Sequence, residues 1–189
     1  SDPPSGLLSD DGRLSPLAYV PETTLTRVDP ALRRFAAAQG GPAVNRDGVL
    51  ALAHAVRAAM DYVPGVTDVA DTAAQSFAQR RGVCQDHAHV MLACCRALRI
   101  PARYVSGYVL TDDQGHVASH AWVDVWLEAE RGWFSVDVTN RQVAGQRHCR
   151  LAIGRDYLDA APVRGVRRGG GHESMAVTVT VTSGQVQQQ

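Results

Sequence analysis

The spacing of apolar residues changes along the chain. In the first half they recur three and four positions apart, as in helices that bury one face, and after Pro101 they alternate with other residues, as in strands. This pattern predicts helices over residues 30–39, 47–62, 71–81 and 84–98. It predicts strands over residues 103–110, 120–127, 133–139 and 174–182. Helices followed by a run of strands indicate an α+β fold with an antiparallel sheet.

Composition divides the chain of 189 residues into three parts. Residues 1–25 are rich in Pro, Ser, Asp and Thr and show no period, so we expect an arm or linker after an upstream domain that this sequence lacks. Residues 26–165 contain the four helices and three of the strands and form the expected core. Residues 166–189 hold a glycine loop, the last predicted strand and a polar tail.

Charge narrows the class of partner. The 19 basic and 19 acidic residues balance, so no electrostatic argument favours nucleic acid or an anionic membrane. No apolar run is long enough to span a bilayer. A hydrophobic fraction of 45% is enough for a packed core. We expect a globular domain that binds neither nucleic acid nor membrane.

The four cysteines do not suggest a disulfide framework, since Cys94 and Cys95 are adjacent and adjacent cysteines rarely bridge. With no signal-like apolar segment, a reducing cytoplasm is the expected location. No Cys-x-x-Cys pair is present, and His87 and His89 would point about 200° apart on a helix. We therefore expect no metal site.

Cys84 is the candidate nucleophile. It follows Gly82 and Val83 and opens a predicted helix. Unpaired backbone N–H groups and the positive end of the helix dipole meet there, and both favour the thiolate, which is the nucleophilic form of cysteine. The same N–H groups can stabilise an oxyanion formed on a substrate. Cys94 and Cys95, in the middle of the helix among apolar residues, are expected to be buried.

Alternation places His120 and Asp137 on one face of the predicted sheet. In residues 120–127 the odd positions are all apolar, and in residues 133–139 the even positions are all apolar. These apolar sets face the core, so His120 and Asp137 share the opposite face. A turn near residues 128–131 would bring them within direct or diagonal reach across the two strands. A carboxylate there can hold an imidazole in one tautomer and stabilise its charged form.

Several segments resemble one known family. Residues 82–89 (GVCQDHAH), 118–122 (ASHAW) and 137–140 (DVTN) resemble the core motifs of bacterial transglutaminase-like proteins. Residues 154–157 (GRDY) and 162–165 (PVRG) resemble a later segment of that family. The similarity covers most of the chain, with the motifs in the expected order.

The resemblance implies a papain-like cysteine-proteinase fold in which N-terminal helices pack on an antiparallel sheet. It makes residues 26–165 the catalytic core and assigns Cys84 as nucleophile, His120 as general acid and base, and Asp137 as the residue that orients the histidine. It also implies thiol acyl chemistry on amides without a cofactor. His87 departs from the family, which usually has Phe there. No second oxyanion donor is evident, although Gln79 and Tyr62 are nearby.

The resulting hypothesis is an enzyme that attacks a glutamine carboxamide or a peptide bond of a protein or peptide substrate through a thioester. Water or an amine would then resolve the thioester, by hydrolysis or by transfer. One alternative is an arylamine N-acetyltransferase-like enzyme that uses an acyl-CoA donor. Another is a non-catalytic protein-binding module on the same fold.

Overall fold

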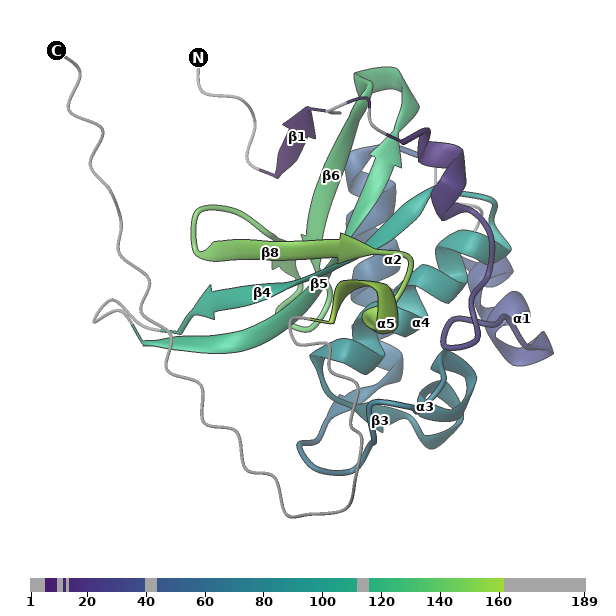
Figure 1. The fold of residues 1–189 in the computed structure, drawn as a ribbon. Helices are drawn as coiled ribbons and strands as arrows, with labels where there is room; N and C mark the ends of the chain where they lie inside the picture. The colour runs from purple at the N-terminus through teal and green to yellow at the C-terminus, as the bar shows by residue number, and fades with distance from the viewer. Residues whose placement is uncertain (1–5, 10–11, 13, 40–43, 112–115, 162–189) are drawn as a thin grey trace, which may run out of the picture.

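The computed structural model describes residues 6–9, 12, 14–39, 44–111 and 116–161. Figure 1 shows helices gathered on one side of a twisted sheet. The strand predicted over residues 174–182 and the rest of the C-terminal part lie outside the described residues.

Four of the five described α-helices begin at a capping side chain. The α-helices are α1 (Pro30–Ala38), α2 (Arg46–Ala59), α3 (Ala73–Gln79), α4 (Cys84–Ala97) and α5 (Tyr157–Ala160), and two short 3₁₀ helices are η1 (Pro16–Tyr19) and η2 (Glu128–Glu130). Asp29 accepts a hydrogen bond from the backbone of Leu32 at 2.7 Å at the start of α1, and Asn45 does the same for Gly48 at 2.8 Å at the start of α2. No described helix is long and apolar enough to cross a membrane.

The main sheet is antiparallel throughout its described strands. These are β1 (Leu7–Ser9), β4 (Ala102–Leu110), β5 (Val117–Leu127), β6 (Gly132–Asp137), β7 (Gln142–Val143) and β8 (His148–Gly154). Their order is β1-β6-β5-β4-β8, and β7 also pairs with β6. A separate parallel pair joins β2 (Asp61–Tyr62) to β3 (Arg81–Gly82). Strand β1 lies within residues 1–25, the segment expected to be an arm.

Helix α4 is the central element of the core. It contacts α1, α2 and α3 on one side and strands β4 and β5 on the other. Residues 86–96 are therefore buried on every side of the helix, including Cys94 and Cys95. The sequence pattern predicted a single inner stripe on this helix, but a helix between two layers has no solvent face. All four cysteines are free.

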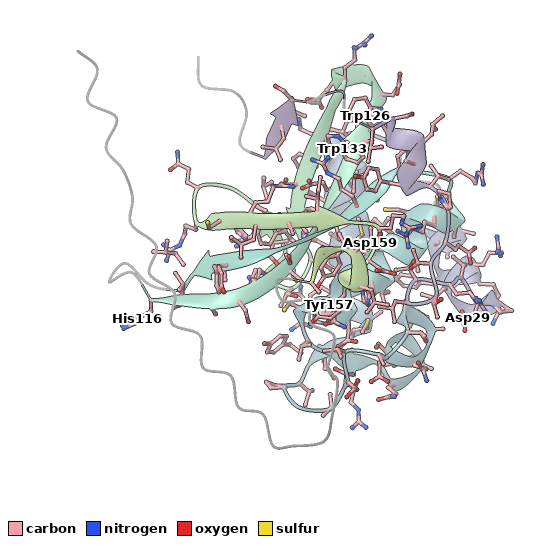
Figure 2. All side chains as sticks on the ribbon, viewed as in Figure 1. Asp29, His116, Trp126, Trp133, Tyr157 and Asp159 are labelled. Atoms are coloured by element: carbon pink, nitrogen blue, oxygen red, sulfur yellow. The ribbon has the colours of Figure 1, made fainter. Side chains whose placement is uncertain are left out.

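The face of the sheet away from α4 is also covered. Tyr19, Trp126 and Trp133 form a small buried cluster. The ring of Tyr19 packs edge-on against that of Trp133 with 5.5 Å between ring centroids. Trp126 packs against Trp133 in the same way at 5.3 Å (Figure 2). Because Tyr19 belongs to η1, this cluster fixes the N-terminal segment onto the sheet.

A buried ionic network crosses the same face. Asp124 on β5 is fully buried and accepts hydrogen bonds from Arg103 on β4 at 2.9 Å and from Arg150 on β8 at 2.9 Å, while the Ser135 hydroxyl donates from β6. Burial raises the pKa of Asp124, but the two arginines outweigh it and hold the carboxylate ionised. One charged group thus links four neighbouring strands.

We expect Asp124→Asn to destabilise the protein, because it leaves two guanidinium groups without their buried counter-ion. Breaking one side of a buried ion pair costs about 3–5 kcal/mol. The measurement is the free energy of unfolding in urea. The matched control is Glu130→Gln, which breaks the solvent-exposed pair with Arg46 and should change stability little. Equal losses in the two variants would contradict the assigned role of Asp124.

Candidate active site

The start of α4 is held by one buried carboxylate. Asp86, 1% exposed, accepts hydrogen bonds from the hydroxyls of Thr67 and Ser76, each at 2.7 Å, and from the backbone N–H of Val83 at 2.8 Å. These donors come from the loop before α3, from α3 itself and from the residue that precedes Cys84. Asp86 therefore fixes the backbone from which Cys84 projects.

Gly82 is required by this packing. A Cβ at this position would lie 2.5 Å from the Cβ of Asp86. Cys84 then becomes the first residue of α4, partly exposed, where the N–H groups of the first helical turn have no partner within the helix. The structure thus puts the candidate nucleophile at the helix N-terminus, as the sequence predicted.

Strand pairing brings His120 to Asp137. Val123 on β5 pairs with Val136 on β6, and continuing this register makes His120 and Asp137 diagonal neighbours. The imidazole Nε2 lies 2.8 Å from the Asp137 Oδ2. Nε2 is thereby occupied, and Nδ1 is the nitrogen that remains for Cys84. His120 and Cys84 line one common cavity.

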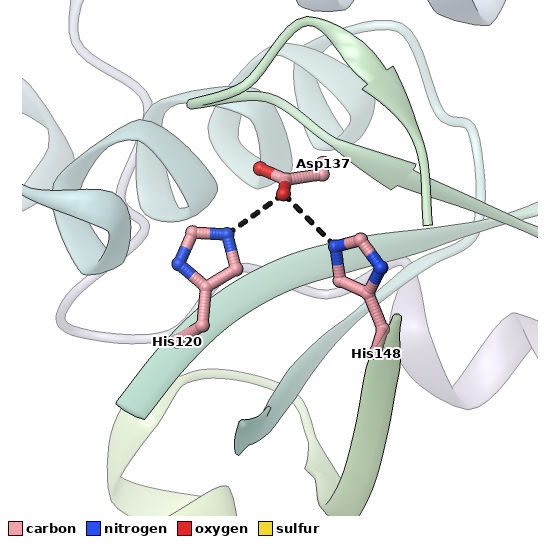
Figure 3. A group of neighbouring side chains, drawn as sticks. All are labelled: His120, Asp137 and His148. Carbon is pink, nitrogen blue, oxygen red and sulfur yellow. Dashed lines mark hydrogen bonds and ion pairs between the residues drawn. The ribbon is translucent and has the colours of Figure 1, made fainter. Parts of the chain in front are cut away.

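Asp137 also binds a second histidine, which sequence reasoning did not identify. His148 on β8 places its Nε2 3.0 Å from the same Oδ2, so that His120 and His148 flank the carboxylate (Figure 3). The Asn140 side chain donates to Oδ2 at 2.7 Å, and its backbone N–H donates to Oδ1 at 3.1 Å. The fully buried carboxylate therefore has four donors.

The tautomer of His148 follows from its other nitrogen. The backbone N–H of Gly145 donates to His148 Nδ1 at 3.2 Å, so Nδ1 is the acceptor and Nε2 carries the proton. His148 Nε2 can then donate to Asp137. His120, Asp137 and His148 offer ligand atoms within 4.8 Å of one another, as a metal site would. A metal at His148 Nε2 would need that nitrogen deprotonated and Nδ1 protonated, opposing the Gly145 N–H, so this group does not fit a metal ion.

Charge is concentrated at the His120–Asp137 pair. Burial lowers the pKa of His120, but the hydrogen bond with Asp137 and the interaction with Cys84 outweigh it and raise the pKa to about 9. Burial raises the pKa of Asp137, but the hydrogen bonds from His120 and His148 outweigh it and hold the pKa well below its usual range. At neutral pH the pair is an imidazolium and a carboxylate.

The other histidines of α4 are core residues. His89 is fully buried, and its Nε2 accepts a hydrogen bond from the backbone of Tyr157 at 3.2 Å. His87, also fully buried, has its Nδ1 3.0 Å from the Thr139 hydroxyl. Burial lowers the pKa of each imidazole to about 4, so both are neutral at pH 7. His87 is therefore a buried, neutral side chain at a position where the family usually has Phe.

Two cavities meet at the candidate pair. A cavity of about 290 Å³ is lined by Cys84 and His120. A larger one of about 860 Å³ is lined by His120, Asn140 and Tyr62 but not by Cys84. Tyr62 is brought to the site by the pairing of β2 with β3, because its partner Gly82 lies two residues before Cys84. Gln79, the other residue considered as an oxyanion donor, is exposed at the end of α3 and lines neither cavity.

Comparisons with known proteins agree with these motifs. The model of the transglutaminase-like superfamily matches residues 33–138, more than half of the chain. An uncharacterized protein of Mycobacterium leprae is 36% identical over 178 residues, which cover 91% of this chain. The chain spans 61% of the length of that relative. A protein-glutamine gamma-glutamyltransferase of Pseudomonas aeruginosa is 38% identical over 104 residues, 48% of this chain and 15% of that protein.

Solved structures confirm the predicted fold class. A crystal structure of a protein from Cytophaga hutchinsonii, proposed to be a cysteine protease, superposes with a TM-score of 0.66 at 30% identity and covers 79% of this chain and 50% of that one. The periplasmic domain of TgpA from Pseudomonas aeruginosa gives a TM-score of 0.50 at 28% identity, with coverage of 67% and 49%. The α+β, papain-like arrangement of helices on an antiparallel sheet is thus confirmed.

The raised pKa of His120 predicts a pH dependence of stability. A folded pKa of about 9 lies above the unfolded value of 6.5, so the stabilisation is complete below pH 6.5 and is lost as the pH rises through 9. We expect the difference in unfolding free energy between the wild type and His120→Gln to shrink over this range, measured by urea denaturation at each pH.

Comparing the wild type with His120→Gln also removes a second contribution to the pH dependence of stability, which has the same sign. Burial raises the pKa of Cys95 to about 12 and that of Cys94 further, so both thiols also weaken the fold at alkaline pH. They are unchanged in His120→Gln and cancel in the difference. A difference that stays constant from pH 6 to about pH 10 would contradict the assigned state of His120.

Proposed function

Since the chain belongs to the transglutaminase-like superfamily, we propose that it is a cysteine-dependent enzyme that opens amide bonds of proteins or peptides through a thioester. One observation carries the proposal: His120 is bound to Asp137 through Nε2 at 2.8 Å and shares a cavity with Cys84 at the start of α4. Cys84, His120 and Asp137 then supply the nucleophile, the general acid and base, and the orienting carboxylate of a catalytic triad.

In the first half of the reaction, the Cys84 thiolate attacks the carbonyl carbon of a glutamine side chain or a peptide bond. The S–C bond forms, and the carbonyl oxygen gains a negative charge that the N–H groups at the start of α4 can stabilise. As the C–N bond breaks, His120 gives its proton to the departing nitrogen, which leaves as ammonia or an amine. The positive charge of His120 below pH 9 suits this role.

In the second half, His120 is neutral and acts as base. It takes a proton from water, or from an amine, as that molecule attacks the thioester. The S–C bond breaks, and the thiolate is restored beside the imidazolium. Hydrolysis gives a carboxylic acid, and transfer gives a new amide.

His148 and Asn140 act on this chemistry through Asp137. Their hydrogen bonds keep the carboxylate ionised and fix the direction in which Oδ2 points. We assign both as positioning residues. This arrangement favours an enzyme over a non-catalytic module, because a module has no need to hold a buried carboxylate against an imidazolium beside an accessible cysteine.

We expect Cys84→Ala to abolish turnover, since the covalent route needs the thiol. Losses of about 10³-fold or more are typical for such nucleophiles. The assay is a panel of fluorogenic peptide amides and of glutamine peptides, with and without an added amine, read by amide cleavage and ammonia release. Cys149→Ala, which removes another partly exposed cysteine, is the control and should remain active. Turnover in Cys84→Ala at the wild-type rate would refute the proposal.

We expect His148→Leu to lower kcat by about 10- to 100-fold, since Asp137 loses one donor and no longer orients His120 fully. His148→Gln, whose amide can still donate to Asp137, should recover much of the loss. The decisive measurement is the ratio of kcat between the two variants, with the urea midpoint of each measured beside it. A merely structural role would lower stability together with activity. A wild-type kcat in His148→Leu, or an equal loss of kcat in both variants that parallels an equal loss of stability, would contradict the positioning role.

A further inference from the structure

The two cavities at the candidate site divide the substrate into two halves. Cys84 lines only the smaller cavity, whereas His120 and Ser119 line both. The proposed chemistry bonds the acyl carbon to the Cys84 sulfur and sends the leaving nitrogen to His120. The acyl group therefore extends on the cysteine side, into the smaller cavity, and the amine half extends past His120 into the larger one.

The walls of the smaller cavity are mostly apolar and aromatic, and Gln85, Ser106 and Ser119 add neutral polar side chains. The walls include Tyr104, Tyr108, Tyr157 and Leu151. Among the described lining residues, His120 alone has an acidic or basic side chain of the Asp, Glu, Arg, Lys or His type. Tyr104 is 2% exposed. Its ring packs against the rings of His89 and Tyr157, with 5.3 and 6.4 Å between ring centroids. Tyr157 is the first residue of α5 (Figure 2). These contacts make a firm wall.

Leu151 completes the cavity at its rim. It lies on β8 and is 54% exposed, so its side chain faces water although it lines a cavity of mostly apolar walls. Covering such a surface with an apolar group is favourable. A volume of about 290 Å³ is at the lower end of small-molecule sites and has room for a single aromatic or branched aliphatic group.

We propose that this cavity is the acyl-side specificity subsite and that it takes an uncharged aromatic or large aliphatic group attached near the reacting carbonyl. The proposal rests on the function assigned to Cys84 and goes beyond it by naming the substrate class. A charged acyl side chain would lose its hydration here without gaining an ion pair from the walls. Leu151 at the rim is the residue that distinguishes apolar from charged acyl groups.

The test uses aldehydes, which carry an acyl part but no leaving group and so can occupy only the acyl side. The Cys84 sulfur adds to the aldehyde carbon, the oxygen takes a proton, and the resulting thiohemiacetal reversibly blocks the thiol. The probes are 3-phenylpropanal, butanal and succinic semialdehyde. Protection is measured as the concentration that halves the rate of Cys84 alkylation by iodoacetamide, followed by peptide mapping. The chain contains no Lys, so aldehydes have no side-chain amine to bind.

We expect 3-phenylpropanal to protect Cys84 at a concentration about tenfold or more below that of butanal, because burying a ring is worth at least that factor. Succinic semialdehyde should protect least. Leu151→Glu should weaken protection by 3-phenylpropanal about fivefold or more, since a charge then stands at the rim. Equal protection by the three aldehydes would overturn the subsite.

Two control variants carry the same new charge elsewhere. Leu158→Glu changes an equally exposed leucine, 57% against 54%, that lines neither of the two cavities. Gln142→Glu places the charge in the larger cavity. In both variants 3-phenylpropanal should protect Cys84 as it does in the wild type. A loss of protection in either variant as large as in Leu151→Glu would refute the proposed division of the substrate between the two cavities. Failure of iodoacetamide to label Cys84 faster than Cys149 would instead refute the proposed function and the subsite with it.

Discussion

The buried carboxylate of Asp137 is the group on which the geometry of the site depends. A buried carboxylate is stable as an anion only when its oxygens are satisfied by donors, and here the donors come from β5, β8 and the turn after β6. These segments must therefore converge at the end of β6. Convergence of β8 brings His148 beside His120, and His120 shares a cavity with Cys84 at the start of α4. The arrangement of the candidate site and the convergence of these segments depend on the same hydrogen bonds.

A second buried carboxylate fixes the backbone on the helical side of the site. Asp86 binds the loop before α3, α3 and the residue before Cys84, and Gly82 allows its close approach. The two halves of the site are thus each held by one buried acid. Neither acid has to move for Cys84 and His120 to meet, because α4 packs directly on β5. A site built on such fixed elements is preorganised for its transition state.

Local periodicity predicted much of this arrangement, for a physical reason. The alternation of residues 120–127 and 133–139 is imposed by burial of one face of each strand, and a tight turn between adjacent strands leaves few registers. The pairing of His120 with Asp137 followed from these two facts. The starts of α1 and α4 were predicted to the residue, because a proline after a capping aspartate and a glycine before the cysteine mark them.

Contacts between distant segments could not be predicted in the same way. β8 pairs with β4 rather than with a neighbour in sequence, so nothing in the spacing of His148 indicated that it would reach Asp137. Thr67 and Ser76, which bind Asp86, were indistinguishable from other polar residues of loops and caps. Asp124 lies on the strand face opposite the apolar residues 121, 123, 125 and 127, and its complete burial follows from contacts with Arg103 on β4 and Arg150 on β8.

The charges of the larger cavity bear on how the proposed thioester is resolved. Arg57 and Arg147 line this cavity with His120, and no carboxylate is among its described lining residues. A protonated amine such as a lysine side chain would approach against positive charge, in a cavity whose walls weaken screening by water. Water meets no such repulsion. If the proposed amine half occupies this cavity, its two guanidinium groups oppose a cationic acceptor and do not oppose water.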